Sequence, residues 1–73
     1  MNKQRRSKIA EALELISQAR EILEEVKEEE REIYQDLPRG LQWTKRGEQM
    51  QENVSNLEEF IGYLEETDRL EEM

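Results

Sequence analysis

The apolar residues in the first half of the chain recur every three or four positions, which is the spacing of one face of an α-helix. Two such sets run through residues 9–37, and no proline or glycine interrupts them. The first set is Ile9, Leu13, Ile16, Leu23, Ile33 and Leu37, and the second is Ala12, Leu15, Ala19, Ile22, Val26 and Ile33. The pattern predicts one long helix over about residues 8–36, with two neighbouring apolar stripes.

Two interpretations are possible for the start of this helix, and two for its middle. Ser7 is a candidate N-cap for a helix that begins at Lys8, and Asn2 is the alternative cap for an earlier start. No apolar residue lies between Val26 and Ile33. In that interval the helix either leaves its packing partner or presents acidic side chains on all sides.

A turn is predicted at residues 37–43. Pro38 has no amide hydrogen and disfavours helical geometry at Leu37, and Gly40 tolerates a positive φ angle. We expect Leu37, Leu41 and Trp43 to fold back here and close the end of the helical bundle.

A second helix is predicted over about residues 44–68, with Thr44 as its N-cap. Gly47 lies on its apolar line next to the turn, where a close approach of the chain would require a glycine. Gly62 has no comparable explanation, and Phe60 widens the line on one flank. The line itself advances by steps of four and three residues through Met50, Val54, Leu57, Ile61 and Leu64.

Two long helices joined by a short turn define an all-α antiparallel hairpin, a single domain that covers residues 1–73. A lone core of this size rarely contributes more than roughly 3–5 kcal/mol, and the chain has no cysteine for disulfides. The first helix also carries more apolar surface than one partner helix can cover. We therefore predict self-association, as a homodimer that forms a four-helix bundle or as a higher oligomer. Its predicted interface is Ile9, Ala12, Leu15, Ile16, Ala19, Ile22, Leu23 and Val26.

Composition limits the chemistry of the chain. There is no histidine or cysteine, the commonest ligands of transition metals, and no Gly-rich phosphate loop or nucleophile–base pair. The abundant carboxylates are typical of a solvated acidic face. We predict no catalytic residue, no metal site and no cofactor, and hence a protein that is not an enzyme.

The charge of the chain points toward protein partners. Eleven basic and 19 acidic residues leave a net charge of −8, which disfavours binding to nucleic-acid phosphates and favours contact with a basic surface. Trp43 either closes the core or, if exposed, anchors a protein partner. The candidate partner surface consists of Trp43, Arg39, Lys45, Arg46, Glu25, Glu28, Glu29 and Glu32.

Three further functions are compatible with the sequence. Rows of carboxylates along a rod could imitate a nucleic-acid duplex and occupy the groove of a DNA-binding enzyme. The basic residues at the N-terminus and the turn could bind nucleic acid directly, although the net charge opposes this. The chain could also be a structural subunit of a larger particle.

Several stretches give the chain a family likeness. They are Ile33-Tyr34-Gln35-Asp36-Leu37-Pro38, Leu41-Gln42, Lys45-Arg46-Gly47-Glu48-Gln49-Met50 and Asn56-Leu57-Glu58-Glu59. Through them the C-terminal two-thirds of the chain resembles small acidic helical-hairpin proteins encoded by phages and mobile elements. The resemblance implies a protein that binds and inhibits or redirects a host machine, including host defence systems, and it transfers no site residue.

No apolar run approaches the roughly 18 residues of a membrane span, and the basic N-terminus lacks the apolar core of a signal peptide. We therefore expect no membrane partner and a cytoplasmic location, in the host cell if the protein is phage-encoded.

Overall fold

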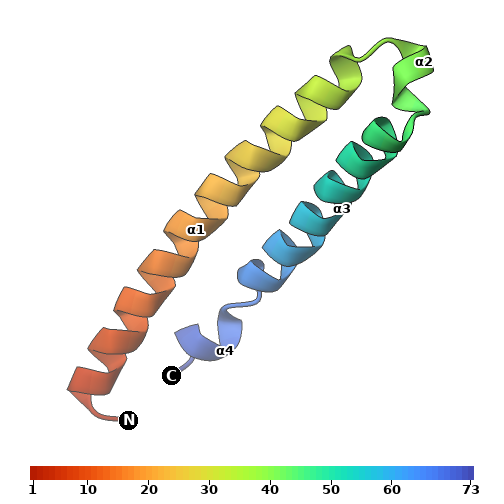
Figure 1. The fold of residues 1–73 in the computed structure, drawn as a ribbon. Helices are drawn as coiled ribbons and strands as arrows, with labels where there is room; N and C mark the ends of the chain where they lie inside the picture. The colour runs from red at the N-terminus through yellow and green to blue at the C-terminus, as the bar shows by residue number, and fades with distance from the viewer.

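The computed structural model describes residues 1–73 as an elongated all-α hairpin, as predicted (Figure 1). Its helices are α1 (Lys3–Asp36), α2 (Arg39–Gln42), α3 (Lys45–Glu65) and α4 (Asp68–Glu71). Helices α1 and α3 lie side by side in opposite directions, and α4 turns back toward the N-terminal part of α1. The molecule measures 58 × 15 × 13 Å, so almost every side chain is close to water.

Helix α1 begins five residues before the predicted start at Lys8. Asn2 is its N-cap, because the Asn2 Oδ1 atom accepts a hydrogen bond of 2.8 Å from the Arg5 amide. The earlier start is therefore the correct alternative, and Ser7 lies inside the helix. Water screens the cationic first turn, whose interaction with the helix dipole is unfavourable. The helix ends at Asp36, as predicted.

The predicted turn contains one short helix. Gly40 lies within α2 and does not adopt a positive φ angle, so the role expected for its flexibility is wrong. The side-chain amide of Gln42 donates to the carbonyls of Tyr34 and Leu37, each at 3.2 Å. Because the last carbonyls of a helix have no partner within it, Gln42 caps α1 and holds the turn against its end.

The start of α3 packs tightly against this turn. Thr44 is the N-cap, as predicted, and its hydroxyl accepts a hydrogen bond from the Gly47 amide. Gly47 is buried, and a Cβ atom there would lie 2.3 Å from the Gln42 carbonyl oxygen. The close approach expected at Gly47 is confirmed. Around Gly62 a Cβ atom would meet nothing, so that glycine is not required by packing.

The second helix is shorter than predicted. It ends at Glu65 rather than near residue 68, and the short helix α4 follows it. The Glu71 amide donates to the carbonyl of Thr67, which closes the single turn of α4.

The hydrophobic core is very small. Met50 and Ile61, both on α3, are its only buried hydrophobic residues, and α1 has no buried residue. The face of α1 toward α3 and α4 is half-buried instead, through Ile9, Leu13, Ile16, Leu23, Tyr34 and Leu37. A hairpin with so little enclosed apolar surface has little stability of its own.

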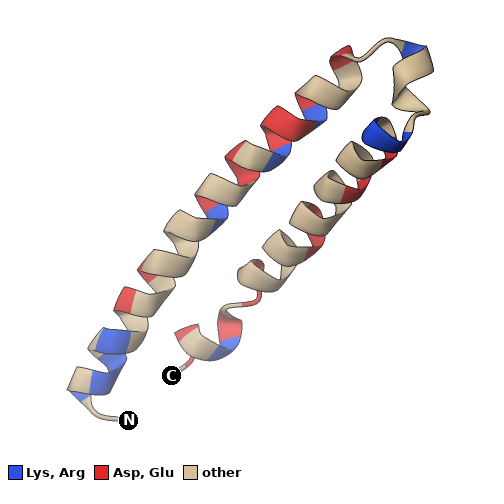
Figure 2. Ribbon diagram, viewed as in Figure 1, with Lys and Arg blue, Asp and Glu red and all other residues tan.

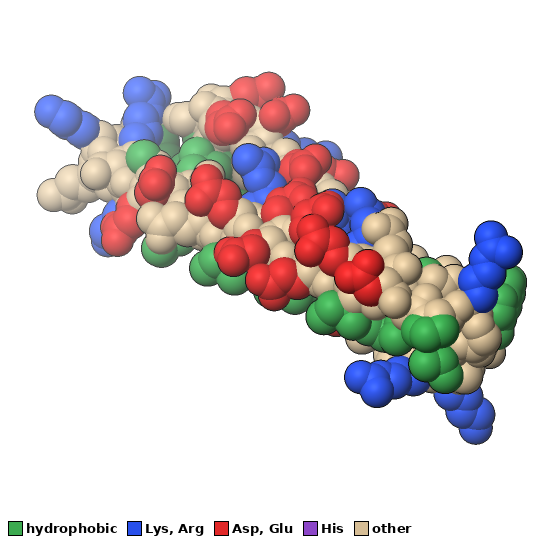
Figure 3. Space-filling model, turned by 90° about the horizontal axis from the view of Figure 1, so that it is seen from above, with side chains coloured by type: hydrophobic (Ala, Val, Ile, Leu, Met, Phe, Trp, Pro, Cys, Tyr) green, Lys and Arg blue, Asp and Glu red, His purple; other side chains and the backbone are tan.

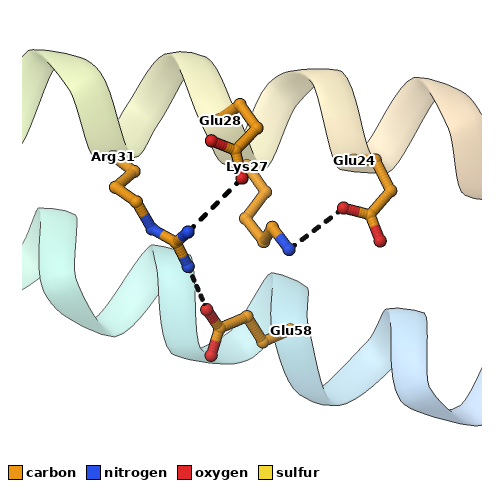
Figure 4. Close-up of polar contacts among 5 residues, drawn as sticks. All are labelled: Glu24, Lys27, Glu28, Arg31 and Glu58. Carbon is orange, nitrogen blue, oxygen red and sulfur yellow. Dashed lines mark hydrogen bonds and ion pairs between the residues drawn. The ribbon is translucent and has the colours of Figure 1, made fainter.

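Charged side chains fill the middle of the helix pair, where α1 lacks apolar residues (Figure 4). Lys27 lies between the helices with its side chain 14% exposed, and its Nζ atom is 3.0 Å from Glu24. Arg31 pairs with Glu28 on α1 and reaches across to Glu58 on α3. Thus α1 does not leave its partner in this interval, although partly exposed ion pairs add only about 0.2–1 kcal/mol each.

Candidate interaction surface

An uncovered apolar stripe runs along α1. It lies about 100° around the helix from the face toward α3, as follows from 3.6 residues per turn. Leu15 is 58% exposed and Ile22 is 61% exposed, which is unusual for large aliphatic residues in a folded chain. Figure 3 shows hydrophobic side chains at the surface along one edge of the rod. The members of the apolar stripe are Ala12, Leu15, Ala19, Ile22, Val26 and Ile33, all exposed.

The eight residues predicted for an oligomer interface fall on two different faces. Ile9, Ile16 and Leu23 are half-buried on the face of α1 that packs within the hairpin. The five others belong to the apolar stripe and are free to meet a partner. The sequence pattern revealed both stripes, but only the fold determines which one the chain itself covers.

Helix α3 carries two exposed aromatic residues, of which Phe60 lies beside the apolar stripe of α1. Phe60 is exposed and lines a shallow hollow of about 380 Å³ together with Val26. Tyr63 is also exposed, and it neighbours Phe60 because residues three apart are adjacent on a helix surface. Sequence reasoning placed Phe60 on the flank of the α3 line and passed over Tyr63. Their shared spacing of three residues was the available signal.

The turn carries an exposed basic and aromatic tip, formed by Arg39, Leu41, Trp43, Lys45 and Arg46. Trp43 is 82% exposed, so the prediction that it closes the bundle is wrong, and so is the same prediction for Leu41. Of the three residues expected to close this end, only Leu37 is half-buried.

The indole has no space inside the hairpin. The main chain of Leu41 and Gln42 already packs against Gly47 there. Figure 2 shows basic residues gathered at this turn. The tip therefore presents an aromatic ring beside cationic side chains.

The predicted acidic positions lie at the surface of α1. Glu25, Glu28, Glu29 and Glu32 are all exposed, and of these only Glu28 forms an ion pair. Figure 2 shows acidic residues over the middle of the rod and on α4, and basic residues at the start of α1 and at the turn; Figure 3 shows acidic side chains over the middle of one face. No three acidic side chains are grouped to hold a metal ion.

The largest hollow, about 640 Å³, opens between α1 and α3 beside Arg31 and Tyr34. Only two of its eight lining residues are hydrophobic. It is therefore a wet groove over the polar part of the helix pair, and the apolar stripe and the tip are the two features that carry exposed apolar surface.

Comparisons with protein-family models, with curated proteins and with solved structures find no match to this chain. None of its helices has an apolar stretch of sufficient length to cross a lipid bilayer. A functional proposal for this chain therefore rests on its exposed residues, chiefly those of the apolar stripe and the tip.

Proposed function

We propose that the protein is a non-enzymatic interaction protein that self-associates through the apolar stripe into a four-helix bundle. One observation carries this proposal. The hairpin encloses only Met50 and Ile61 as hydrophobic core, while the apolar stripe lies open to water.

Burying a half-exposed aliphatic side chain contributes about 1 kcal/mol. Covering the apolar stripe in two copies would therefore add several kcal/mol to a hairpin that has little stability of its own. A second hairpin is a suitable cover, since pairing two helix pairs gives a common bundle architecture. The mass of the protein in solution tests this proposal, because a monomer at micromolar concentration would contradict it.

The tip is the surface that we propose for a different protein partner. Exposed tryptophan and arginine side chains are the commonest anchors of protein interfaces. Basic residues lie at the start of α1 and at the turn, and Lys27 and Arg31 interrupt the row of acids along α1 that duplex mimicry requires (Figure 2). The resemblance to small phage-encoded hairpins makes a host protein, including a component of a host defence system, the kind of partner that we propose.

We expect Trp43→Ala to abolish binding of this partner and to leave the hairpin intact. The side chain is 82% exposed, so its loss should change the free energy of unfolding by less than about 0.5 kcal/mol. The loss of an interface anchor should weaken binding by about 30-fold or more. The measurement compares the proteins retained from host lysate by the tagged wild type and by the variant.

Trp43→Phe serves as the conservative control and should keep part of the binding, because it retains an aromatic ring. If the alanine variant retains the same host protein as the wild type, the tip is not the binding surface.

A further inference from the structure

The spacing of the apolar stripe continues past both of its ends into charged residues. From Ala12 toward the N-terminus, steps of four and three residues reach Lys8 and Arg5. Toward the turn, the same steps meet Glu29 between Val26 and Ile33, and then Asp36. All four side chains are exposed. One face of α1 therefore runs from basic through apolar to acidic.

We propose that a second copy of this chain docks on this face with its α1 antiparallel to the first. The inference rests on the proposed self-association and adds its orientation and register. A two-fold axis between residues 19 and 22 places Ala19 opposite the second copy's Ile22, and Leu15 opposite its Val26. A small residue then meets a large one in the two layers next to the axis, and two branched aliphatic residues meet in the layers beyond them, which suits close packing.

The ends of the interface are complementary in charge only in this orientation. The same register places Arg5 opposite the second copy's Asp36. It places Lys8 opposite Ile33, with Glu29 and Asp36 of the second copy one helical turn to either side. A parallel pair would instead stack Arg5 on Arg5 and Lys8 on Lys8, and the acids on each other. Like charges held together destabilise a helix pair, so the charges select the antiparallel arrangement.

Helix α3 supplies apolar surface at the level of this axis. Leu64 lies by Ile16 and Arg20 of α1, and Phe60 shares a hollow with Val26. Residues 60–64 therefore lie level with the centre of the apolar stripe along α1, and Phe60 lies beside the stripe itself. The antiparallel dimer brings Phe60 of both copies toward the axis, where α3 also contributes to the interface.

Cross-linking through introduced cysteines tests the orientation cleanly, because the chain has no cysteine of its own. Ala12 should lie opposite the second copy's Glu29. A mixture of Ala12→Cys and Glu29→Cys should therefore give a mixed cross-linked dimer with a short bismaleimide.

Ala12→Cys alone should give none, since its two thiols would be about 25 Å apart along the helices. Efficient cross-linking of Ala12→Cys to itself would show a parallel dimer and overturn the inference.

Charge reversal gives an independent readout. Lys8→Glu should weaken self-association about tenfold at low salt, with a smaller effect at high salt, because each dimer loses two attractive contacts. Lys3→Glu is the matched control, since Lys3 lies about 140° around the helix from Lys8, and it should have a much smaller effect.

An unchanged dissociation constant for Lys8→Glu would contradict the antiparallel contact, because a parallel pair faces like charge with or without this change. If the protein still dimerises, efficient cross-linking of Ala12→Cys to itself or an unchanged dissociation constant for Lys8→Glu would reject the antiparallel orientation but not the self-association. A wild type that stays monomeric would reject the proposed function as well.

Discussion

Replacing Gly47 with alanine is expected to lower the free energy of unfolding by about 2–3 kcal/mol, a loss typical of an overpacked site. The new Cβ atom would lie 2.3 Å from the Gln42 carbonyl oxygen and 2.8 Å from that of Leu41. Both are main-chain atoms, so relief requires the turn to move away from α3. Urea unfolding followed by circular dichroism measures the loss.

Gly62→Ala is the matched control for this substitution. Its Cβ atom would meet no neighbour, and Gly62 lies inside α3 without a positive φ angle. The same change should therefore raise the free energy of unfolding, by about 1 kcal/mol, through helix propensity. Equal effects at the two glycines would show that Gly47 is not held by its contact with the turn.

Replacing Ile22 with glutamine is expected to weaken self-association by about 100-fold. Ile22 is 61% exposed in the hairpin and near the centre of the apolar stripe, and each dimer would lose two such side chains. Full burial of a large aliphatic side chain contributes about 1.5–3 kcal/mol, and the dimer would bury only the part of Ile22 that the hairpin leaves exposed. Sedimentation equilibrium over a range of concentrations gives the two dissociation constants.

Glu21→Gln is the matched control, because it introduces glutamine in the same helical turn, about 100° around the helix from Ile22. Glu21 is exposed and forms no ion pair, so its dissociation constant should stay close to that of the wild type. If Ile22→Gln associates as tightly as Glu21→Gln, the apolar stripe is not the contact surface.

Local signals in the sequence were sufficient to predict most of the fold. The steps of three and four residues determine both long helices, and Thr44 and Pro38 mark the turn by their own chemistry. The role of Gly47 could also be predicted, because a glycine on an apolar line next to a turn implies a close approach of the chain. The error at the N-terminus arose because Asn2 and Ser7 both have the side chain of an N-cap, and only the hydrogen bond to Arg5 distinguishes them.

The surface was less predictable, because it depends on how the two helices meet. The two stripes of α1 look alike in the sequence, and the turn decides which of them faces α3. Trp43 was expected to close the core together with Leu37 and Leu41, yet the main chain of Leu41 and Gln42 packs against Gly47 at that end. Local spacing says which residues share a face, whereas tertiary packing says which face is free.

Sedimentation equilibrium of the unmodified protein tests the central claim most directly. The claim predicts a species of twice the 8.8-kDa chain mass at micromolar concentration, with dissociation on dilution. A chain that keeps the mass of one copy throughout, with the apolar stripe accessible to water, would contradict it.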